Sequence, residues 1–152
     1  MNKFFEIKLI DRDNVNYLIR NLEDFEKDKA VRGGLSSAGS VFLSGGKSRL
    51  KSRMKSGSKG VKGNLLRSFQ VRVKKNKPGV LIGFKQGVGG GSHAHLVDKG
   101  TNERFWIKKR KSTGRMPANR FWSDTEAQDY PKAMDKLYMG IEKAVNRINN
   151  RQ

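Results

Sequence analysis

The chain has 152 residues, of which 33 are Lys or Arg and 14 are Asp or Glu, so its formal net charge is +19 at pH 7. It contains no cysteine, which excludes a disulfide framework and thiolate metal sites. No apolar run approaches the ~18 residues that a membrane span needs, and no signal-peptide pattern follows Met1. We therefore expect a soluble protein that is intracellular where it is made and does not contact a membrane.

The positive charge lies in the middle of the chain. Residues 1–30 carry six basic and seven acidic side chains, residues 121–152 carry five of each, and residues 31–120 carry 22 basic and two acidic ones. Such a segment attracts polyanions and opposes self-association unless a partner neutralises it. Nucleic acid is the most obvious partner, and an acidic protein surface is the alternative. The hydrophobic content of 35% is low and indicates that part of the chain is ordered only in an assembly.

The N-terminal segment predicts an edge strand followed by a short helix. Residues 2–10 alternate between apolar and polar side chains, which is typical of a strand. Asp13 or Asn14 can cap the helix, whose apolar residues have helical spacing: Val15, Leu18, Ile19 and Leu22.

Residues 28–54 predict a long helix. Its apolar residues follow steps of three and four, with Gly46 filling the gap between Phe42 and Leu50: Val31, Leu35, Ala38, Phe42, Leu50 and Met54. Five glycines fall within it, and each costs ~1 kcal/mol relative to alanine in a helix interior. The helix therefore needs packing partners, and we expect a weak point or a break near Gly45. Small residues also allow another backbone to come close.

A basic stretch, residues 47–62, overlaps the end of this helix. Its first half can continue the helix, and its second half has the composition of a flexible loop. The sequence Gly45-Gly46-Lys47-Ser48 resembles the end of a phosphate-binding loop. However, Val41 stands where the first glycine of that loop belongs, and no strand precedes it. We expect no nucleotide site there.

Residues 69–84 predict the β-hairpin that the rest of the chain covers. Phe69, Val71 and Val73 alternate with polar residues, and a turn with Pro78-Gly79 follows. The second strand continues the apolar face through Val80, Ile82 and Phe84. One face of the hairpin should lie on a core, and the other should be wet and basic.

The next segment predicts two short strands between loops. Residues 86–92 have the composition of a flexible loop, residues 93–98 and 104–108 predict strands, and residues 108–115 predict a basic loop. His93 and His95 would lie on one face of the first strand, with Asp98 on the other. This is a poor ligand set, so polar residues at an interface are favoured over a metal site.

The C-terminal segment predicts an amphipathic helix. Ser123 and Glu126 fit a capping box, and Pro131 is tolerated only near a helix start, so we expect the first turn to be separate. A clean apolar stripe follows: Met134, Leu137, Ile141, Ala144, Val145 and Ile148. The predicted fold is a single α+β domain, residues 1–152. It has a small antiparallel or mixed β-sheet packed by the glycine-containing helix and the C-terminal helix.

The basic runs are the candidate functional site. Trp106, Phe121 and Trp122 lie near the second run, as in a base-stacking platform; a core role is favoured for Phe121 and stays open for the tryptophans. Contacts to DNA would be made to its backbone. No catalytic constellation is visible, and we expect no enzyme, cofactor or metal. The candidate contacts to DNA or an acidic partner are Lys47, Arg49, Lys51, Arg53, Lys55, Lys59, Lys62, Lys108, Lys109, Arg110, Lys111 and Arg115.

Several segments occur in an order typical of a known family. They are Gly63–Ser68 (GNLLRS), the hairpin ending in Ile82-Gly83, Ala94–Thr101 (AHLVDKGT), Met116–Phe121 (MPANRF) and the terminal helix. Over residues 26–150 this order resembles the tail-completion (head–tail joining, or neck) proteins of tailed bacteriophages, a lambdoid-type minor tail component. Asp98 stands where that family usually has Glu, and His93 where it has an aromatic residue.

The resemblance implies a structural virion protein at the neck or tail top. Its subunits would form a ring, with a hexamer favoured, between a portal-side connector and the tail-tube proteins, and DNA would pass through it. The implied assembly motif is Gly63, Asn64, Leu65, Asp98, Gly100, Thr101, Pro117 and Phe121, of which Gly63, Leu65, Asp98, Gly100 and Thr101 would hold a corner of the sheet. The alternative is a standalone, sequence-nonspecific nucleic-acid-binding protein. A nuclease or metal enzyme lacks a carboxylate cluster and ranks last.

Overall fold

The long glycine-containing helix is continuous. In the computed structural model, which describes residues 5–7, 15, 19–20, 24–54, 63–75, 79–87 and 89–151, helix α2 spans Asp24–Arg53. Its 30 residues make a rod of about 45 Å at 1.5 Å per residue. The predicted apolar residues Val31, Leu35, Ala38, Phe42 and Leu50 form its buried face together with Ala30, whereas Met54 follows the end of the helix and is half-buried. The predicted helix is confirmed; of the two alternatives at Gly45, packing holds the helix and no break occurs.

The glycines of α2 explain why the helix survives them. A Cβ on Gly34 would lie 2.7 Å from the carbonyl oxygen of Leu137 on the C-terminal helix, and one on Gly39 would lie 2.6 Å from a methyl of Val71 in the sheet. Gly45 and Gly46 are in equally tight places, against Asp129 and Phe69 respectively. The helix is therefore held between two neighbours, and packing offsets the low helix propensity of glycine.

The predicted hairpin is confirmed, and it forms most of a three-stranded antiparallel sheet. Strands β2 (Phe69–Val73) and β3 (Val80–Phe84) pair with Val71 opposite Ile82, and β1 (Phe5–Ile7) adds to the far side of β3, giving the order β1-β3-β2. Val80 and Ile82 are fully buried. β1 lies within the predicted edge strand; the rest of that segment, and most of the predicted N-terminal helix, lie outside the described residues.

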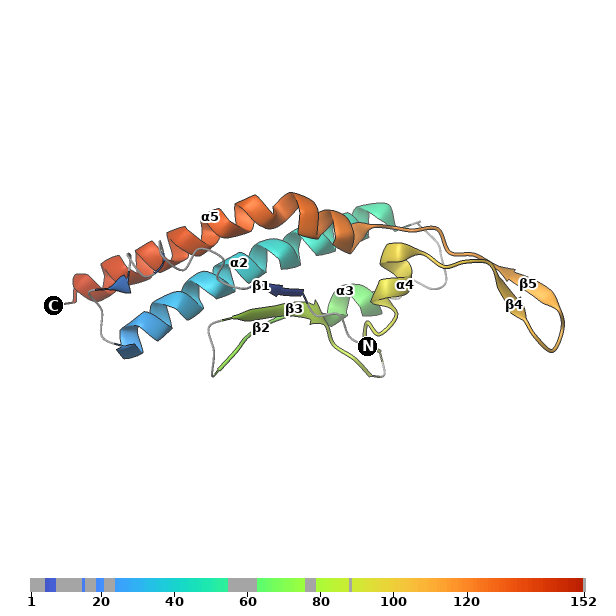
Figure 1. Ribbon diagram of the computed structural model, residues 1–152, viewed down its shortest axis with the longest axis horizontal. Helices are drawn as coiled ribbons and strands as arrows, with labels where there is room; N and C mark the ends of the chain where they lie inside the picture. Colours follow the sequence, from blue (N-terminus) through green and yellow to red (C-terminus); the bar gives the residue numbers. More distant parts are fainter. Residues whose placement is uncertain are drawn as a thin grey trace.

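The C-terminal helix α5 (Phe121–Asn149) packs along α2, as Figure 1 shows. Leu137 and Ile141, from the predicted stripe, are buried in the shared core. Two expectations are wrong. Pro131 lies inside the helix without separating its first turns, because contacts with α2 hold both halves. Ser123 is not the N-cap, since the helix already begins at Phe121.

The segment between the sheet and α5 differs most from expectation. Residues Ala94–Lys99 form a short helix, α4, and not a strand. Its buried residues, Ala94 and Asp98, are four apart, which is helical spacing; the alternation of the two histidines was coincidental. The strand at Arg104–Trp106, β4, is confirmed, but half of the predicted basic loop is a second strand, β5 (Lys111–Gly114). Another short helix, α3 (Asn64–Ser68), precedes β2.

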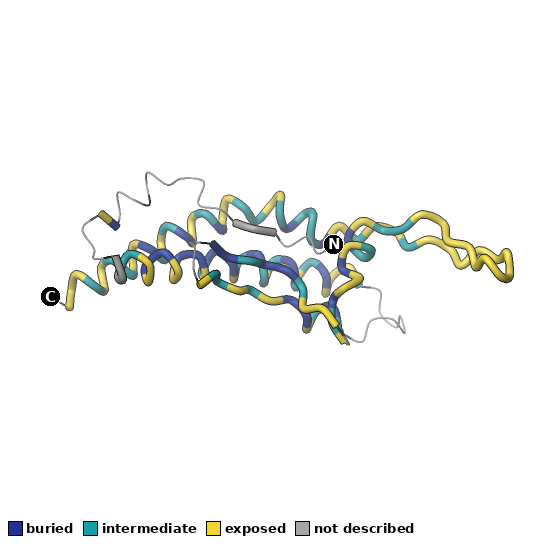
Figure 2. The backbone as a smooth tube through the Cα atoms, turned by 60° about the horizontal axis from the view of Figure 1, so that its bottom comes forward, coloured by how far each residue is buried: buried dark blue, intermediate teal, exposed yellow. Residues whose placement is uncertain are grey.

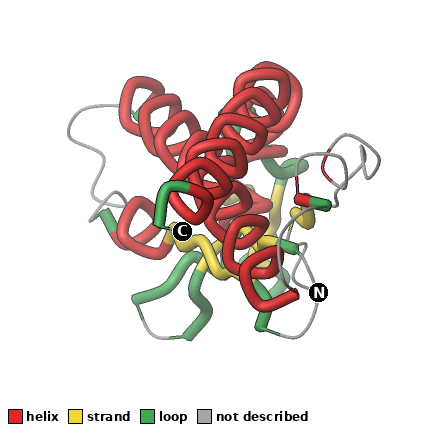
Figure 3. Tube along the Cα trace, turned by 90° about the vertical axis from the view of Figure 1, so that its left-hand side faces the viewer, coloured by secondary structure: helices red, strands yellow, loops and turns green. Residues whose placement is uncertain are grey.

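The layers follow from these elements. Viewed along the long axis, the two long helices lie on one side of the sheet (Figure 3). The buried residues line the space between them, whereas the β4–β5 hairpin is exposed (Figure 2). The main core also includes Val15 and Ile19 from the N-terminal segment. A second cluster, beside α3 and α4, is centred on Leu50, Leu65, Phe69, Ala94 and Phe121.

Within the predicted flexible loop 86–92, Gly91 is buried, and its backbone N–H donates to the carbonyl of Lys85.

Candidate functional site

Strands β4 and β5 form an arm that projects beyond the rest of the described chain (Figures 1 and 2). They pair antiparallel, with Phe105 opposite Ser112 and Trp106 opposite Lys111. Every residue of both strands is exposed. An isolated two-stranded hairpin is at best marginally stable in water, because it has no core of its own. The side chains of the arm are therefore available to a partner, and the arm would gain stability from one.

The arm combines apolar and cationic side chains. Phe105, Trp106 and Ile107 are 60%, 52% and 90% exposed. Six of the twelve residues from 104 to 115 are Lys or Arg, and none is Asp or Glu. The Nζ atom of Lys109 lies 4.9 Å from the ring centre of Trp106, a cation–π contact. Within the described residues, no ion pair joins a cation of the arm to a carboxylate.

The base of the arm is fixed by hydrogen bonds between its two ends. The backbone N–H of Thr101 donates to the carbonyl of Met116 at 2.9 Å, and the N–H of Met116 donates to the Thr101 hydroxyl at 3.0 Å. Gly100 has φ 75°, and a Cβ there would lie 2.6 Å from the Met116 oxygen. Only glycine combines that backbone conformation with so close an approach.

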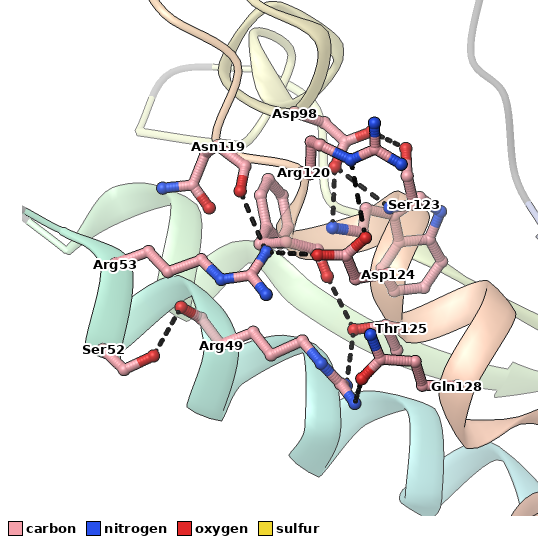
Figure 4. Close-up of polar contacts among 12 residues, drawn as sticks. Arg49, Ser52, Arg53, Asp98, Asn119, Arg120, Ser123, Asp124, Thr125 and Gln128 are labelled. Carbon is pink, nitrogen blue, oxygen red and sulfur yellow. Dashed lines mark hydrogen bonds and ion pairs between the residues drawn. The ribbon is translucent and has the colours of Figure 1, made fainter.

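Asp98 joins α4 to the start of α5. One carboxylate oxygen, Oδ1, accepts the backbone N–H groups of Trp122 and Ser123 at 2.7 and 3.0 Å, and Oδ2 accepts the Ser123 hydroxyl at 2.5 Å (Figure 4). The side chain is buried, with 5% exposed. These N–H groups have no partner within the helix, and the negative charge of the carboxylate interacts favourably with the positive end of the helix dipole. Asp98 thus supplies the cap that Ser123 was predicted to supply.

Aromatic rings pack beneath this junction. Phe121 is fully buried, and its ring centre lies 5.8 Å from that of Phe69 and 5.9 Å from that of Phe84. Trp122 packs edge-on against Phe84 at 5.5 Å. Phe121 is therefore a core anchor, as favoured, and so is Trp122. Trp122 is partly buried against this cluster, whereas Trp106 is 52% exposed.

Two of the candidate cations hold the helices together. Arg49 binds both carboxylate oxygens of Asp129, at 2.6 and 2.9 Å, and donates to the Thr125 hydroxyl. The hydrogen bond to Asp129 raises the pKa of Arg49, which keeps the guanidinium charged. Such bidentate pairs are among the stronger hydrogen bonds. Arg49 is thus engaged within the chain rather than presented to DNA.

Arg53 makes the second clamp, one turn farther along α2. It donates to Oδ2 of Asp124 at 2.7 Å and to the carbonyl of Asn119 at 2.9 Å (Figure 4). The hydrogen bond from Arg53 lowers the pKa of Asp124, against the opposing effect of burial. Asn119 in turn donates its backbone N–H to the carbonyl of Val97. Arg53 therefore links α2 to the same junction that Asp98 organises.

The other predicted residues are dispersed. Lys47 is half-buried and Lys51 exposed on α2, whereas Lys55, Lys59 and Lys62 lie outside the described residues. Lys108, Lys109, Arg110, Lys111 and Arg115 are all exposed on or beside the arm. The predicted assembly motif divides in two. Gly63, Asn64 and Leu65 start α3, and Asp98, Gly100, Thr101, Pro117 and Phe121 gather at the base of the arm. Asp98, Gly100 and Thr101 hold the start of α5 and the base of the arm, whereas Leu65 and Phe121 pack with Phe69 of β2 in the second core cluster.

The residues considered for a nucleotide site and for a metal site do not have the geometry that such sites need. Gly45–Ser48 lies inside α2, where the backbone amides bond to the preceding turn and cannot hold a phosphate. His93 and His95 are exposed on α4 and its N-cap, and no group of three or more metal-ligating side chains occurs in the described part of the chain. The same part contains no helix long and apolar enough to span a membrane.

The paired arm and the role of Asp98 were not foreseen. The sequence signal for the arm is one-sided, because Phe105, Trp106 and Ile107 favour a strand before the cationic turn, whereas only Thr113 does so after it. The family resemblance marked Asp98 as a motif residue, but no local signal indicated that it caps α5, since its partners lie 24 and 25 residues away. Comparison of the chain with known protein families, with curated proteins and with solved structures found no match.

Proposed function

We propose that this chain is a structural subunit of a tailed-phage or prophage virion, one that completes the tail or joins head to tail without catalysing a reaction. Copies of it would form a ring, with a hexamer favoured, at the neck or tail top. Its neighbours would be a portal-side connector and the tail-tube proteins, and DNA would pass through the ring.

The observation that carries this proposal is the meeting of the motif residues at one place. The segments Ala94–Thr101 and Met116–Phe121, on which the family resemblance rests, bond to each other along their backbones. Asp98, Gly100 and Thr101 all contribute to that contact. Residues that match a family motif and also fix the base of a projecting arm fit a protein whose role is to hold that arm in position.

The arm itself supports a role in assembly. It is fully exposed and has no core beneath it, so a partner is needed to stabilise it. Exposed Phe, Trp and Ile side chains beside cations are typical of surfaces that bind other molecules.

The charge sets the condition for ring assembly. Each subunit carries +19, so six copies would repel one another at low ionic strength. At 1 M salt the screening length is about 3 Å, and that repulsion is largely removed. We therefore expect closed rings at high salt, or at low salt when a polyanion is present.

Sedimentation velocity of the full chain over a range of salt and protein concentrations tests the proposal. We expect one discrete oligomer that grows at the expense of the monomer as salt rises. A chain that stays monomeric throughout, with or without a polyanion, would contradict the ring.

The alternative, a standalone nucleic-acid-binding protein, is favoured by the unneutralised cations of the arm. The two functions respond oppositely to salt, because added salt screens subunit repulsion but weakens phosphate contacts. A monomer that binds DNA tightly at low salt and never oligomerises would favour the alternative.

A further inference from the structure

We infer that the β4–β5 arm is a DNA-binding ribbon. The cations at its turn contact the phosphate backbone of duplex DNA, and Trp106 and Ile107 lie against the groove wall. The inference deepens the proposed function by naming the part of the subunit that meets the DNA, and it rests on that function only for the source of the DNA.

Shape is the first argument. The arm is a single antiparallel two-stranded ribbon that stands clear of the body (Figure 1). The major groove of B-DNA is ≈ 12 Å wide and admits such a ribbon. Since no other described element covers either face of the arm, it can enter a groove without first unfolding from the body.

Charge is the second argument. The turn presents Lys108, Lys109 and Arg110 in succession, with Lys111 opening β5, and Arg104 and Arg115 lie at the base. The nearest carboxylate in sequence, that of Glu103, accepts the Ser112 hydroxyl at 2.6 Å and forms no ion pair with these cations. The cations are therefore unneutralised within the described chain, and a polyanion is the partner that offsets their mutual repulsion.

The described part of a second copy of the chain does not offer such a surface. The exposed carboxylates described on the long helices each have a lysine beside them: Asp28 with Lys29, Asp135 with Lys136 and Glu142 with Lys143. A face of alternating charge has little net attraction for a ribbon of one sign. The phosphate backbone carries one negative charge per 3.4 Å of each strand and attracts the whole set of cations.

A lipid bilayer is also less suitable. A hairpin that inserts into a membrane needs apolar side chains at its outermost turn, whereas here three consecutive cations occupy it. Burying them in hydrocarbon is costly. On DNA the same order is favourable, because cations contact the phosphates while an aromatic or apolar side chain packs against sugars and bases. Contacts of this kind position the protein and do not read sequence.

The test compares two charge-matched variants of the full chain in binding to a short fluorescent duplex by anisotropy. The first replaces Lys108, Lys109, Arg110 and Lys111 by Ala. The second, the control, replaces four exposed cations of α5 by Ala: Lys132, Lys136, Lys143 and Arg147. Both lose four charges, so any difference between them reports on position.

We expect the arm variant to lose at least about tenfold in affinity at low salt, and the slope of log affinity against log salt to fall by about 3 to 4, since each phosphate contact contributes ~0.9. The control variant should keep most of both. Trp106→Ala should weaken binding further, and Met139→Ala, another exposed apolar side chain, should not.

Equal losses in both variants, or no loss in the arm variant, would overturn the inference. So would stronger binding of the wild-type chain to vesicles containing anionic lipid than to the duplex. The oligomeric state of each variant is measured in parallel. An arm variant that forms no oligomer but binds DNA normally would make the arm a contact between subunits and overturn the inference alone. A monomer that binds DNA through the arm would sustain the inference and overturn the ring.

Discussion

At the scale of single residues, Asp98 connects α4 to the start of α5. Its carboxylate accepts three hydrogen bonds from the first turn of α5, and its own backbone carbonyl accepts the N–H of Arg120. A helix start that is half-buried needs such a partner, because water cannot replace it. Asp98 therefore fixes where α5 begins and how the arm leaves the body.

Replacing Asp98 by Ala should cost about 2–3 kcal/mol in the free energy of unfolding, since a helix cap is lost and buried N–H groups are left without a partner. Urea denaturation measures this. Asp135→Ala removes an exposed carboxylate from α5, the helix that Asp98 caps, and should change stability by less than about 0.5 kcal/mol. Equal effects of the two substitutions would show that the cap is not important.

The Arg53–Asp124 pair predicts how stability depends on pH. The hydrogen bond from Arg53 lowers the pKa of Asp124 in the folded protein. The unfolded chain, in which Asp has a pKa of about 3.9, then takes up the proton first as pH falls. The pair therefore stabilises the fold above about pH 4, and this contribution is lost as the pH falls through the lowered pKa of the folded state.

Asp124→Asn removes the titrating group and checks this sign. Urea denaturation of the wild type and of the variant should differ at pH 7, in favour of the wild type, and should converge toward pH 2. Asp135→Asn, with no ion pair among the described residues, should show a smaller pH-dependent difference. A gap between wild type and Asp124→Asn that stays constant from pH 7 to pH 2 would contradict the role of the pair.

At the scale of elements, two glycines of α2 distinguish the effect of helix propensity on stability from the effect of packing between helices. Gly33 and Gly34 are neighbours in sequence, but a Cβ on Gly33 would meet nothing within 4 Å, whereas one on Gly34 would meet the Leu137 carbonyl oxygen at 2.7 Å. Gly140 of α5 faces Gly34 at the same crossing, where a Cβ on it would lie 2.9 Å from the Gly34 Cα. At this crossing both helices lack a side chain, which lets their backbones come close together.

Gly33→Ala should stabilise the protein by about 0.5–1 kcal/mol, because it improves helix propensity at an open site. Gly34→Ala should destabilise it by about 1–3 kcal/mol, because the backbone of α5 must move. Thermal and urea unfolding of both variants measure the difference. Two alanines with the same stabilising effect would mean that the helices are not in close contact there.

The elements that sequence predicted are those with a local signal. The alternation through Phe69–Val73 and the stripe through Leu137 and Ile141 each repeat over several residues, so strand and helix could be read directly. The break expected at Gly45 and the separation expected at Pro131 did not occur, because packing between α2 and α5 outweighs local preference. The helical state of α4 and the clamps of Arg49 and Arg53 depend on partners far along the chain, which a single sequence does not reveal.

At the scale of the whole molecule, the net charge of +19 divides into two kinds of cation. Arg49 and Arg53 are paired with carboxylates of α5 and stabilise the body. The cations of the arm are exposed and have no ion-pair partner among the described residues. The sequence analysis placed both kinds of cation in one set of candidate contacts, because a run of basic residues does not reveal which of them form ion pairs within the chain. The separation agrees with a body that is stable by itself and an arm that needs a partner.

Electron cryo-microscopy of the full chain at high salt tests the proposed function most directly. A subunit that joins head and tail should form closed rings with a central opening, and the β4–β5 arms should occupy equivalent positions around it. We predict class averages dominated by such rings, of one copy number. A field of single subunits, or of open filaments that never close, would contradict a ring-forming virion protein.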